Sequence, residues 1–315
     1  MPETLNSGVH ETVLLREAVD ALLTDPSGFY VDGTFGRGGH STALLSGLSA
    51  SGELLAIDRD SEAVAVGLES FAGDKRIEIA QTEFSNVSAL VEQRNKLGKV
   101  SGMLFDLGVS SPQIDKAERG FSFSKEGALD MRMSAGKGLS AADWLNSAEL
   151  EEIVKVLKEY GEEKFARRIA TAIVARQQSA PLETTTDLVE LIDQAVPVKD
   201  PNKHPATRSF QAIRIHINDE LGEVERMLND SVDLLAPEGR LVVISFHSLE
   251  DRIVKRFMRD HSRPKPVPRD IPVTANQSDR PRLKLVGKAI KPSAAEVARN
   301  PRARSAVMRV AEKVY

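Results

Sequence analysis

The most constraining feature of this 315-residue chain is a glycine-rich turn between two short apolar segments. The segment Tyr30-Val-Asp-Gly-Thr-Phe-Gly-Arg-Gly-Gly-His40 runs from an apolar strand into the turn, and Leu54-Leu-Ala-Ile-Asp58 is a second strand that ends on a carboxylate. Glycine lets the backbone come close to a ligand, because it has no Cβ atom to hold the ligand away. A carboxylate at the tip of the next strand suits the two hydroxyl groups of a ribose. The pair therefore predicts a site for a nucleoside-containing cofactor.

The spacing within the turn distinguishes two classes of cofactor. A nicotinamide-binding turn has the pattern G-x-G-x-x-G, with an acidic residue about 20 residues further on. Here Ser41 takes the third glycine position, and Asp32 precedes the turn, where its charge would repel a pyrophosphate and attract the ammonium group of a bound methionine. The turn resembles the D-x-G-x-G-x-G pattern of S-adenosylmethionine (SAM) methyltransferases, with Thr34 at the first glycine position. A strand–turn–helix without a ligand is the alternative, because short glycine motifs also occur by chance.

The length indicates two domains, and the composition is that of a globular protein. Apolar residues make up 41% of the chain and charged residues 28%, which is ordinary for a protein with a full core. The absence of cysteine excludes disulfides, thiolate metal sites and cysteine nucleophiles. The six histidines show no metal-ligand spacing, so we expect no metal. Residues 1–10 lack a signal-peptide core, and no apolar run approaches the roughly 18 residues of a membrane span, so we expect a soluble, cytoplasmic protein.

The charge is distributed unevenly along the chain. Residues 252–315 hold 17 Lys and Arg against 5 Asp and Glu, whereas the rest of the chain holds 25 against 41. A basic region on an acidic body is typical of proteins that bind a polyanion. Few aromatic residues accompany these charges, which indicates contacts with phosphate groups rather than with bases. A solvated basic segment without a ligand is the alternative.

Strand and helix patterns alternate over the first third of the chain. The predicted strands cover residues 30–32, 54–58, 76–80 and 100–106. This alternation predicts an α/β fold with a doubly wound, mostly parallel sheet, in which ligands bind at the carboxyl ends of the strands. Four candidate residues fall near those ends: Asp32, Asp58, Phe84 and Asp106.

After the fourth strand the pattern becomes rich in loops and then entirely helical. The strand pattern returns only at residues 240–246, which read as a buried strand. We therefore predict that residues 1–118 and 209–315 form a Rossmann-like methyltransferase core, and that residues 119–208 form an inserted all-helical domain. The segment 262–292, rich in proline and basic side chains, is predicted to be irregular.

The residues that follow the fourth strand, Asp106-Leu-Gly-Val-Ser-Ser-Pro-Gln113, suit an exocyclic amine. Such an amine is a poor nucleophile, because its lone pair is delocalised into the ring. An oxygen acceptor that binds the amine N–H groups favours the pyramidal geometry from which the lone pair can attack a methyl group, and Asp106 supplies this acceptor. Amino methyltransferases usually carry two prolines and an aromatic residue here. This chain lacks them, so the aromatic partner of the base must come from elsewhere. A helix cap, or a cofactor contact without a chemical role, is the alternative for Asp106.

The glycine-rich turn and the segment after the fourth strand belong to a set of motifs that spans the chain from end to end. They cover residues 10–15, 32–41, 106–113, 119–123, 129–133, 204–208, 245–252 and 300–305. In this combination the chain is similar to the bacterial 16S ribosomal RNA cytosine-N4 methyltransferases. The resemblance implies SAM-dependent methylation of N4 of a decoding-centre cytosine in the small ribosomal subunit. It also implies that the helical insertion recognises the substrate and that 16S rRNA is the partner, whereas it leaves the choice between monomer and homodimer open.

The resemblance also implies which residues bind SAM. Carried over position by position, they are Gly38, Gly39, His40, Asp58, Phe84, Asp106 and Gln113, and the charge argument adds Asp32. Phe84 would cover the adenine face or simply pack in the core. Asp106 is the expected catalytic residue, which polarises the amine while solvent takes the proton. Two rival functions stay open: a SAM-dependent methyltransferase acting on DNA or protein, and a non-catalytic RNA-binding factor in ribosome assembly.

Overall fold

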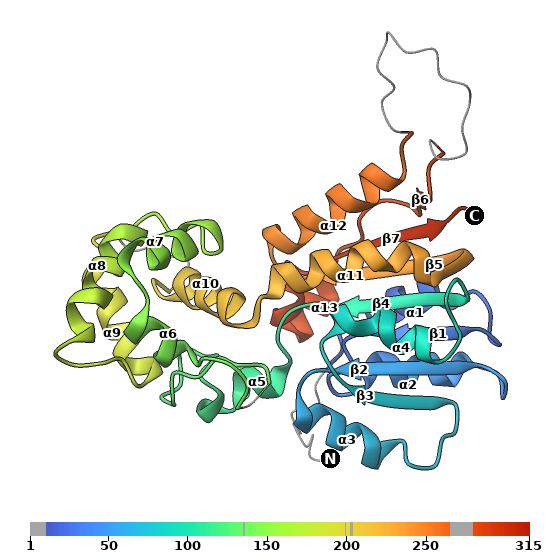
Figure 1. Ribbon diagram of the computed structural model, residues 1–315, viewed down its shortest axis with the longest axis horizontal. Helices are drawn as coiled ribbons and strands as arrows, with labels where there is room; N and C mark the ends of the chain where they lie inside the picture. The colour runs from blue at the N-terminus through green and yellow to red at the C-terminus, as the bar shows by residue number, and fades with distance from the viewer. Residues whose placement is uncertain (1–10, 135, 199, 202–203, 265–279) are drawn as a thin grey trace, which may run out of the picture. The chain divides into compact units, whose positions relative to one another are not determined.

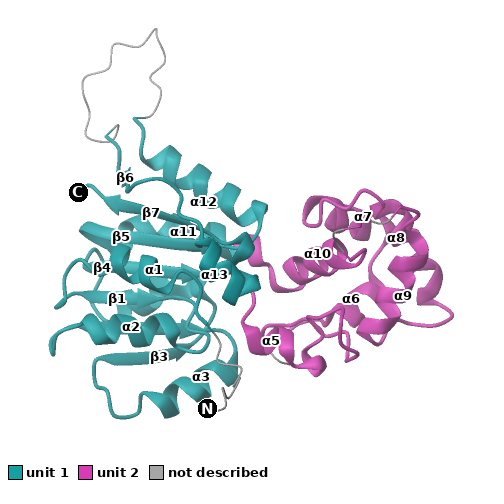
Figure 2. Cartoon of the chain, turned by 180° about the vertical axis from the view of Figure 1, so that it is seen from behind, with its two compact units in different colours: residues 1–108, 223–315 teal, residues 109–222 magenta. Residues whose placement is uncertain are grey.

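The structure, a computed structural model, describes residues 11–315 apart from residues 135, 199, 202–203 and 265–279 (Figure 1). The chain divides into two compact units, which Figure 2 shows in different colours. The first unit comprises residues 1–108 and 223–315, and the second comprises residues 109–222. Within the described residues, no helix is both long and apolar enough to cross a membrane.

The first unit is built on a seven-stranded sheet with the order β3-β2-β1-β4-β5-β7-β6. The strands are β1 (Phe29–Asp32), β2 (Glu53–Asp58), β3 (Ile77–Gln81), β4 (Val100–Asp106), β5 (Leu235–Ser245), β6 (Leu283–Leu285) and β7 (Val307–Lys313). The first five strands run parallel, β7 pairs with β5 in the antiparallel direction, and β6 pairs with β7 in the antiparallel direction. The prediction of a doubly wound, mostly parallel sheet is confirmed.

Helices cover both faces of this sheet. Successive side chains on a strand point to opposite faces, so the apolar residues of β4 and β5 contribute to two separate buried clusters. One buried cluster contains Phe105 and Val243 and includes residues of α4 (Val87–Gln93), α11 (Glu220–Leu234) and α12 (Ser248–His261). The other contains Leu104 and Ile244 and includes residues of α1 (Leu15–Leu22) and α2 (Gly39–Gly47). The other helical elements among the described residues of this unit are α3 (Ser61–Ser70), η1 (Phe84–Asn86), α13 (Ala294–Arg299) and η4 (Pro301–Ser305).

The carboxyl-terminal part of the first unit differs from its prediction. The strand expected at residues 240–246 begins five residues earlier, at Leu235, and a register shift against β4 accommodates the extra residues. Part of the segment predicted to be irregular forms β6, which pairs with β7. Its residues 265–279 lie outside the described residues. The described part of the basic region therefore supplies two strands of the sheet, β6 and β7.

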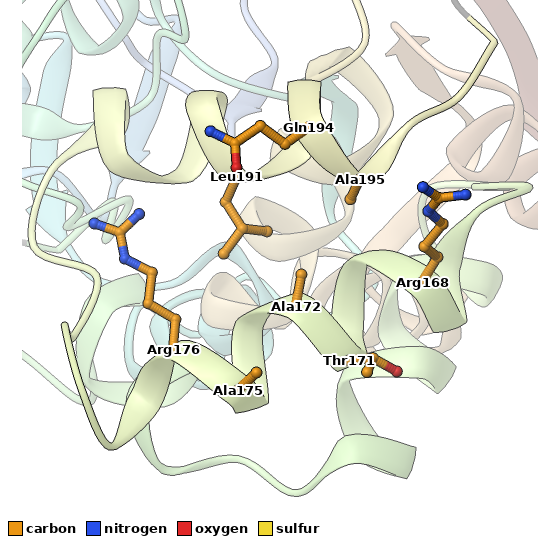
Figure 3. Close-up of a pocket in the computed structure, with 8 residues that line it drawn as sticks. All are labelled: Arg168, Thr171, Ala172, Ala175, Arg176, Leu191, Gln194 and Ala195. Atoms are coloured by element: carbon orange, nitrogen blue, oxygen red, sulfur yellow. The ribbon is translucent and has the colours of Figure 1, made fainter.

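The second unit is helical. Its elements are α5 (Ser111–Asp115), η2 (Ala117–Arg119), α6 (Ala141–Ser147), α7 (Leu150–Glu159), α8 (Ala166–Gln177), α9 (Thr185–Ala195) and α10 (Thr207–Asn218). A pocket of about 540 Å³ lies between α8 and α9 (Figure 3). Small apolar side chains from both helices form its floor, and Arg168 and Arg176 stand at opposite ends of α8. Arg176 is held by Asp187 at 2.6 Å, whereas Arg168 is exposed and has no ion pair within the described part of the chain.

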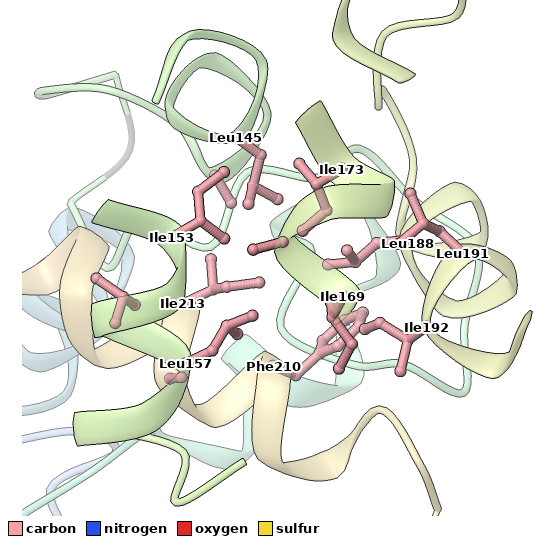
Figure 4. Close-up of a cluster of buried hydrophobic side chains, with 14 of the residues drawn as sticks. Leu145, Ile153, Leu157, Ile169, Ile173, Leu188, Leu191, Ile192, Phe210 and Ile213 are labelled. Carbon is pink, nitrogen blue, oxygen red and sulfur yellow. The ribbon is translucent and has the colours of Figure 1, made fainter. Parts of the chain in front are cut away.

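The second unit includes α10 because side chains of this helix belong to the buried core of the unit. Phe210 and Ile213 of α10 pack with Ile153, Ile169 and Ile173 in a single buried cluster (Figure 4). The sequence predicts that the insertion ends at residue 208, whereas the second unit extends to residue 222. The sequence does not mark this boundary, because its helical pattern runs on towards β5 without an apparent break. Asp219 interrupts this pattern with a left-handed backbone (φ 48°), so that α10 ends there and α11 begins.

Candidate cofactor and substrate site

Three carboxylates stand at the ends of neighbouring strands in the first unit. Asp32 ends β1, Asp58 ends β2 and Asp106 ends β4, and both β2 and β4 pair with β1 in parallel. The carboxyl ends of parallel strands meet at one edge of the sheet, where open α/β sheets bind ligands. The structure thus brings together the three acidic residues that the sequence singled out.

Asp32 is completely buried. Its Oδ2 accepts a hydrogen bond from Ser41 Oγ at 2.7 Å, and its Oδ1 accepts one from the Thr34 N–H group at 3.2 Å. Burial raises the pKa of Asp32 to about 6 although both hydrogen bonds lower it, and the charge of Asp58 adds to the rise. The serine that breaks the nicotinamide pattern therefore serves to hold this carboxylate.

Asp58 connects the end of β2 to the glycine-rich turn. Its Oδ2 accepts a hydrogen bond from the Gly36 N–H group at 2.7 Å, and its Oδ1 accepts one from the Asp60 N–H group at 2.8 Å. Burial raises the pKa of Asp58 above its ordinary value. Each carboxylate oxygen can accept a second hydrogen bond, so the side chain can still receive two hydroxyl groups.

Asp106 differs from the other two because one of its oxygens has no hydrogen-bond partner among the residues that the structure describes. Its backbone N–H donates to Thr34 Oγ1 at 2.6 Å, and its Oδ2 lies 3.8 Å from Nδ1 of the buried His40. Its Oδ1 is buried and has no hydrogen bond within the described part of the chain. Burial raises the pKa of Asp106 well above its usual range, and the charges of Asp32 and Glu250 raise it further. A buried acceptor without a donor is costly, which points to a donor supplied by a ligand.

The glycine-rich turn has a second reason for its glycines. Gly38 adopts a left-handed conformation (φ 74°) at the start of α2, and a Cβ there would lie 2.8 Å from the Phe35 ring. A Cβ on Gly39 would lie 1.9 Å from Thr12 Oγ1. The missing side chains thus make room for protein atoms as well. No side chain caps α2 within the described residues, so the first-turn N–H groups of this helix suit an anion such as a carboxylate.

Phe84 lies just past β3, in η1. Its ring meets the ring of Phe105 edge to face, with centroids 5.8 Å apart and planes at 66°. The side chain remains half-buried while it packs against the core. Core packing and a cofactor contact are therefore compatible at this position.

Gln113 belongs to the second unit and is not among the residues that the first unit brings together. It is buried in the first turn of α5, where its Oε1 accepts a hydrogen bond from the Ser110 N–H group at 3.0 Å. Together the two residues form a capping box. A cofactor role for Gln113 rests on the resemblance alone.

Sequence reasoning missed Thr34 and Glu250 as parts of the site. Thr34 joins the ends of β1 and β4 through its contacts with Asp32 and Asp106. Glu250 is 1% exposed, and its Oε2 accepts hydrogen bonds from the Phe246 N–H group at 2.8 Å and the His247 N–H group at 3.3 Å. The capping-box spacing from position 247 to 250, directly after a strand, is the signal that could have located Glu250.

The strand order, the antiparallel β7 and the carboxylates at the strand tips define a Rossmann-like methyltransferase fold. The chain belongs to the MraW methylase family, whose model matches residues 7–314. It is 54% identical over 306 residues to the ribosomal RNA small subunit methyltransferase H of Idiomarina loihiensis, covering 97% of each chain. It is 53% identical over 310 residues to the protein of the same name from Alteromonas mediterranea, covering 98% of this chain and 99% of the relative.

Among solved structures, an rRNA methylase from Streptococcus thermophilus aligns with 99% of this chain and 100% of its own length, at 12% identity and a TM-score of 0.40. The predicted family is confirmed by the family match and the two relatives, and the protein is a methyltransferase.

Proposed function

We propose that this protein transfers the methyl group of SAM to the exocyclic N4 of a decoding-centre cytosine in the 16S rRNA of the small ribosomal subunit. The observation that carries the proposal is the buried Oδ1 of Asp106 at the carboxyl end of β4, an acceptor to which no described residue donates. An exocyclic amine supplies such a donor. The relatives named small-subunit rRNA methyltransferases support RNA as the substrate.

The residues at the sheet edge fit SAM better than a dinucleotide. Burial raises the pKa values of Asp32, Asp58 and Asp106, and neighbouring carboxylates add to each rise, so the site is stabilised by a cation and would repel a pyrophosphate. Asp32 suits the ammonium group, Asp58 the ribose hydroxyls and Phe84 the adenine face. Gly38, Gly39 and His40, at the start of α2, suit the carboxylate of the methionine part. When bound, SAM supplies an electrophilic methyl group on a sulfonium centre.

Asp106 is the catalytic residue in the proposed reaction. Its Oδ1 accepts a hydrogen bond from an N–H group of the cytosine amine, which favours the pyramidal nitrogen whose lone pair can attack the methyl group. A nearby cation lowers the pKa of Asp106 and so restores the charge that burial disfavours. Solvent takes the proton once the attacked nitrogen is cationic. The cytosine must be unpaired or extruded, because pairing blocks its N4.

Substrate recognition is assigned to the helical unit together with the basic carboxyl-terminal region. Lys255 and Arg256 are exposed on α12 and make no ion pair with any described residue. Arg168 at the pocket between α8 and α9 is likewise exposed. Such cations suit the phosphate backbone of a large RNA. The proposed ribosomal substrate also places the protein in the cytoplasm.

The proposal is tested with labelled SAM and small subunits from cells that lack this protein, with naked rRNA and DNA in parallel. We expect labelled N4-methylcytidine after digestion of the subunits to nucleosides. Label in DNA alone, or in protein alone, would assign the enzyme to another substrate. SAM binding without transfer to any acceptor would support a factor that acts in assembly without catalysis.

SAM affinity is expected to fall as the pH drops below 6. The pKa of Asp32 is raised to about 6, so its charge is lost below that value and the ammonium group loses its partner. One linked proton weakens binding by about tenfold per pH unit. Isothermal titration between pH 7 and pH 4.5, in two buffers with different ionisation enthalpies, measures both the affinity and the proton release. A constant affinity over this range would show that Asp32 does not face the cation.

A further inference from the structure

The loop after β4 leaves the target base without an aromatic partner. It reads Asp106-Leu-Gly-Val and contributes only small or aliphatic side chains. A base held by its amine alone can still rotate about the hydrogen bond, whereas stacking on an aromatic ring fixes its plane. β5, which pairs with β4, ends at Ser245 and is followed directly by a phenylalanine, Phe246.

The strand register places Phe246 beside Asp106. Asp106 pairs with Ile244, and the Leu107 N–H group donates to the Ile244 carbonyl at 2.9 Å. The chain then continues to Gly108 on one strand and Phe246 on the other. A Cβ built on Gly108 would lie 3.7 Å from Phe246 Cδ2, and Gly108 has a φ of 95°, which favours glycine. No side chain at position 108 therefore covers the ring.

Phe246 packs against the core and remains only partly buried. It packs against the buried cluster that contains Leu104 and Ile244. Its backbone N–H donates to Glu250 Oε2 at 2.8 Å, and Glu250 is itself buried. Within the described residues, Phe246 makes no ring–ring contact with another aromatic side chain. A ring that is packed against the core and still partly exposed at this edge of the sheet is suited to stacking.

We propose that Phe246 stacks on the target cytosine and holds its N4 against Asp106, with Glu250 as the residue that positions the ring. This inference rests on the proposed function and specifies how that site binds its base. It explains why the loop after β4 can dispense with an aromatic residue: the ring comes from the neighbouring strand.

The test compares Phe246→Leu, Phe246→Tyr and Phe246→Trp in the full chain, with small subunits that lack the methyl group. We expect Phe246→Leu to lower kcat/KM for subunits by about 10- to 100-fold, as the loss of one base–aromatic stack implies. The Kd for SAM should stay at the wild-type value, and the tyrosine and tryptophan variants should restore most of kcat/KM. Phe257→Leu is the matched control, because Phe257 on α12 is also half-buried and packs against the core.

Unchanged kcat/KM in Phe246→Leu would overturn the inference. So would an equal loss in Phe257→Leu, which would trace the effect to general packing, or a weakened Kd for SAM, which would place the ring at the cofactor. A wild-type protein that binds SAM but leaves the subunits unmethylated would instead refute the proposed function itself.

Discussion

Asp106→Asn is expected to lower kcat by about 100-fold, in the range found when one preorganised electrostatic contact to a transition state is removed. The asparagine keeps the size of the side chain and an oxygen acceptor, but it cannot regain a negative charge beside the developing cationic nitrogen. Single-turnover methylation of small subunits measures the chemical step, and equilibrium titration measures SAM binding. We expect the Kd for SAM to change much less than kcat.

The fold should not suffer from this substitution, because the charged form of Asp106 is disfavoured in the cofactor-free protein. Asp60→Asn serves as a matched control: Asp60 is buried and caps α3, and asparagine caps a helix equally well. A melting temperature at or above the wild-type value, combined with the loss of turnover, assigns the effect to chemistry. Wild-type turnover in Asp106→Asn would remove this residue from the mechanism.

The parallel half of the sheet was predictable because each strand carries its own local pattern. Residues 100–106 form one apolar run that ends on a carboxylate, and β4 has these bounds. The strands at the carboxyl-terminal end were not predictable in the same way. β6 has only three residues, two of them exposed, and it forms because β7 supplies its hydrogen-bonding partner. Pairing of this kind depends on tertiary context and leaves little trace in a short sequence window.

The acidic residues of the site were predictable from their positions at strand ends, but their environment was not. Thr34 looked like a departure from a glycine pattern, and Ser41 looked like a residue that merely excludes a dinucleotide. In the structure Ser41 donates to Asp32, and Thr34 contacts both Asp32 and Asp106. These contacts join residues on different elements, so no spacing rule along the chain could have identified them. Glu250 has a local signal in its capping-box spacing, but its proximity to Asp106 arises only when β5 pairs with β4.

Asp32→Asn is expected to stabilise the cofactor-free protein at pH 7.5 and to weaken SAM binding by about 100-fold, the usual scale for a lost buried charge contact. The pKa of Asp32 lies at about 6 in the folded state against an ordinary 3.8. Between these two values the folded protein binds more protons than the unfolded chain, so stability falls as the pH rises through this window. Above pH 6 the charged Asp32 lowers the free energy of unfolding by the full amount, about 3 kcal/mol.

Asparagine removes this cost while its amide can still bond to Ser41 Oγ and the Thr34 N–H group. The sign of the pH dependence makes the prediction specific. Asp32→Asn should raise the unfolding free energy at pH 7.5, where the wild-type carboxylate is charged, and should change it little at pH 4, where the folded wild type is already protonated. Urea unfolding at both pH values measures this difference, with Asp60→Asn as the control.

Stabilisation that is equal at both pH values would trace the effect to packing rather than to the charge. Retention of the wild-type Kd for SAM would show that the ammonium group binds elsewhere. A residue that weakens the fold and strengthens ligand binding is what a cation site built from buried carboxylates requires, because the charge that the ligand needs is the same charge that the empty site disfavours.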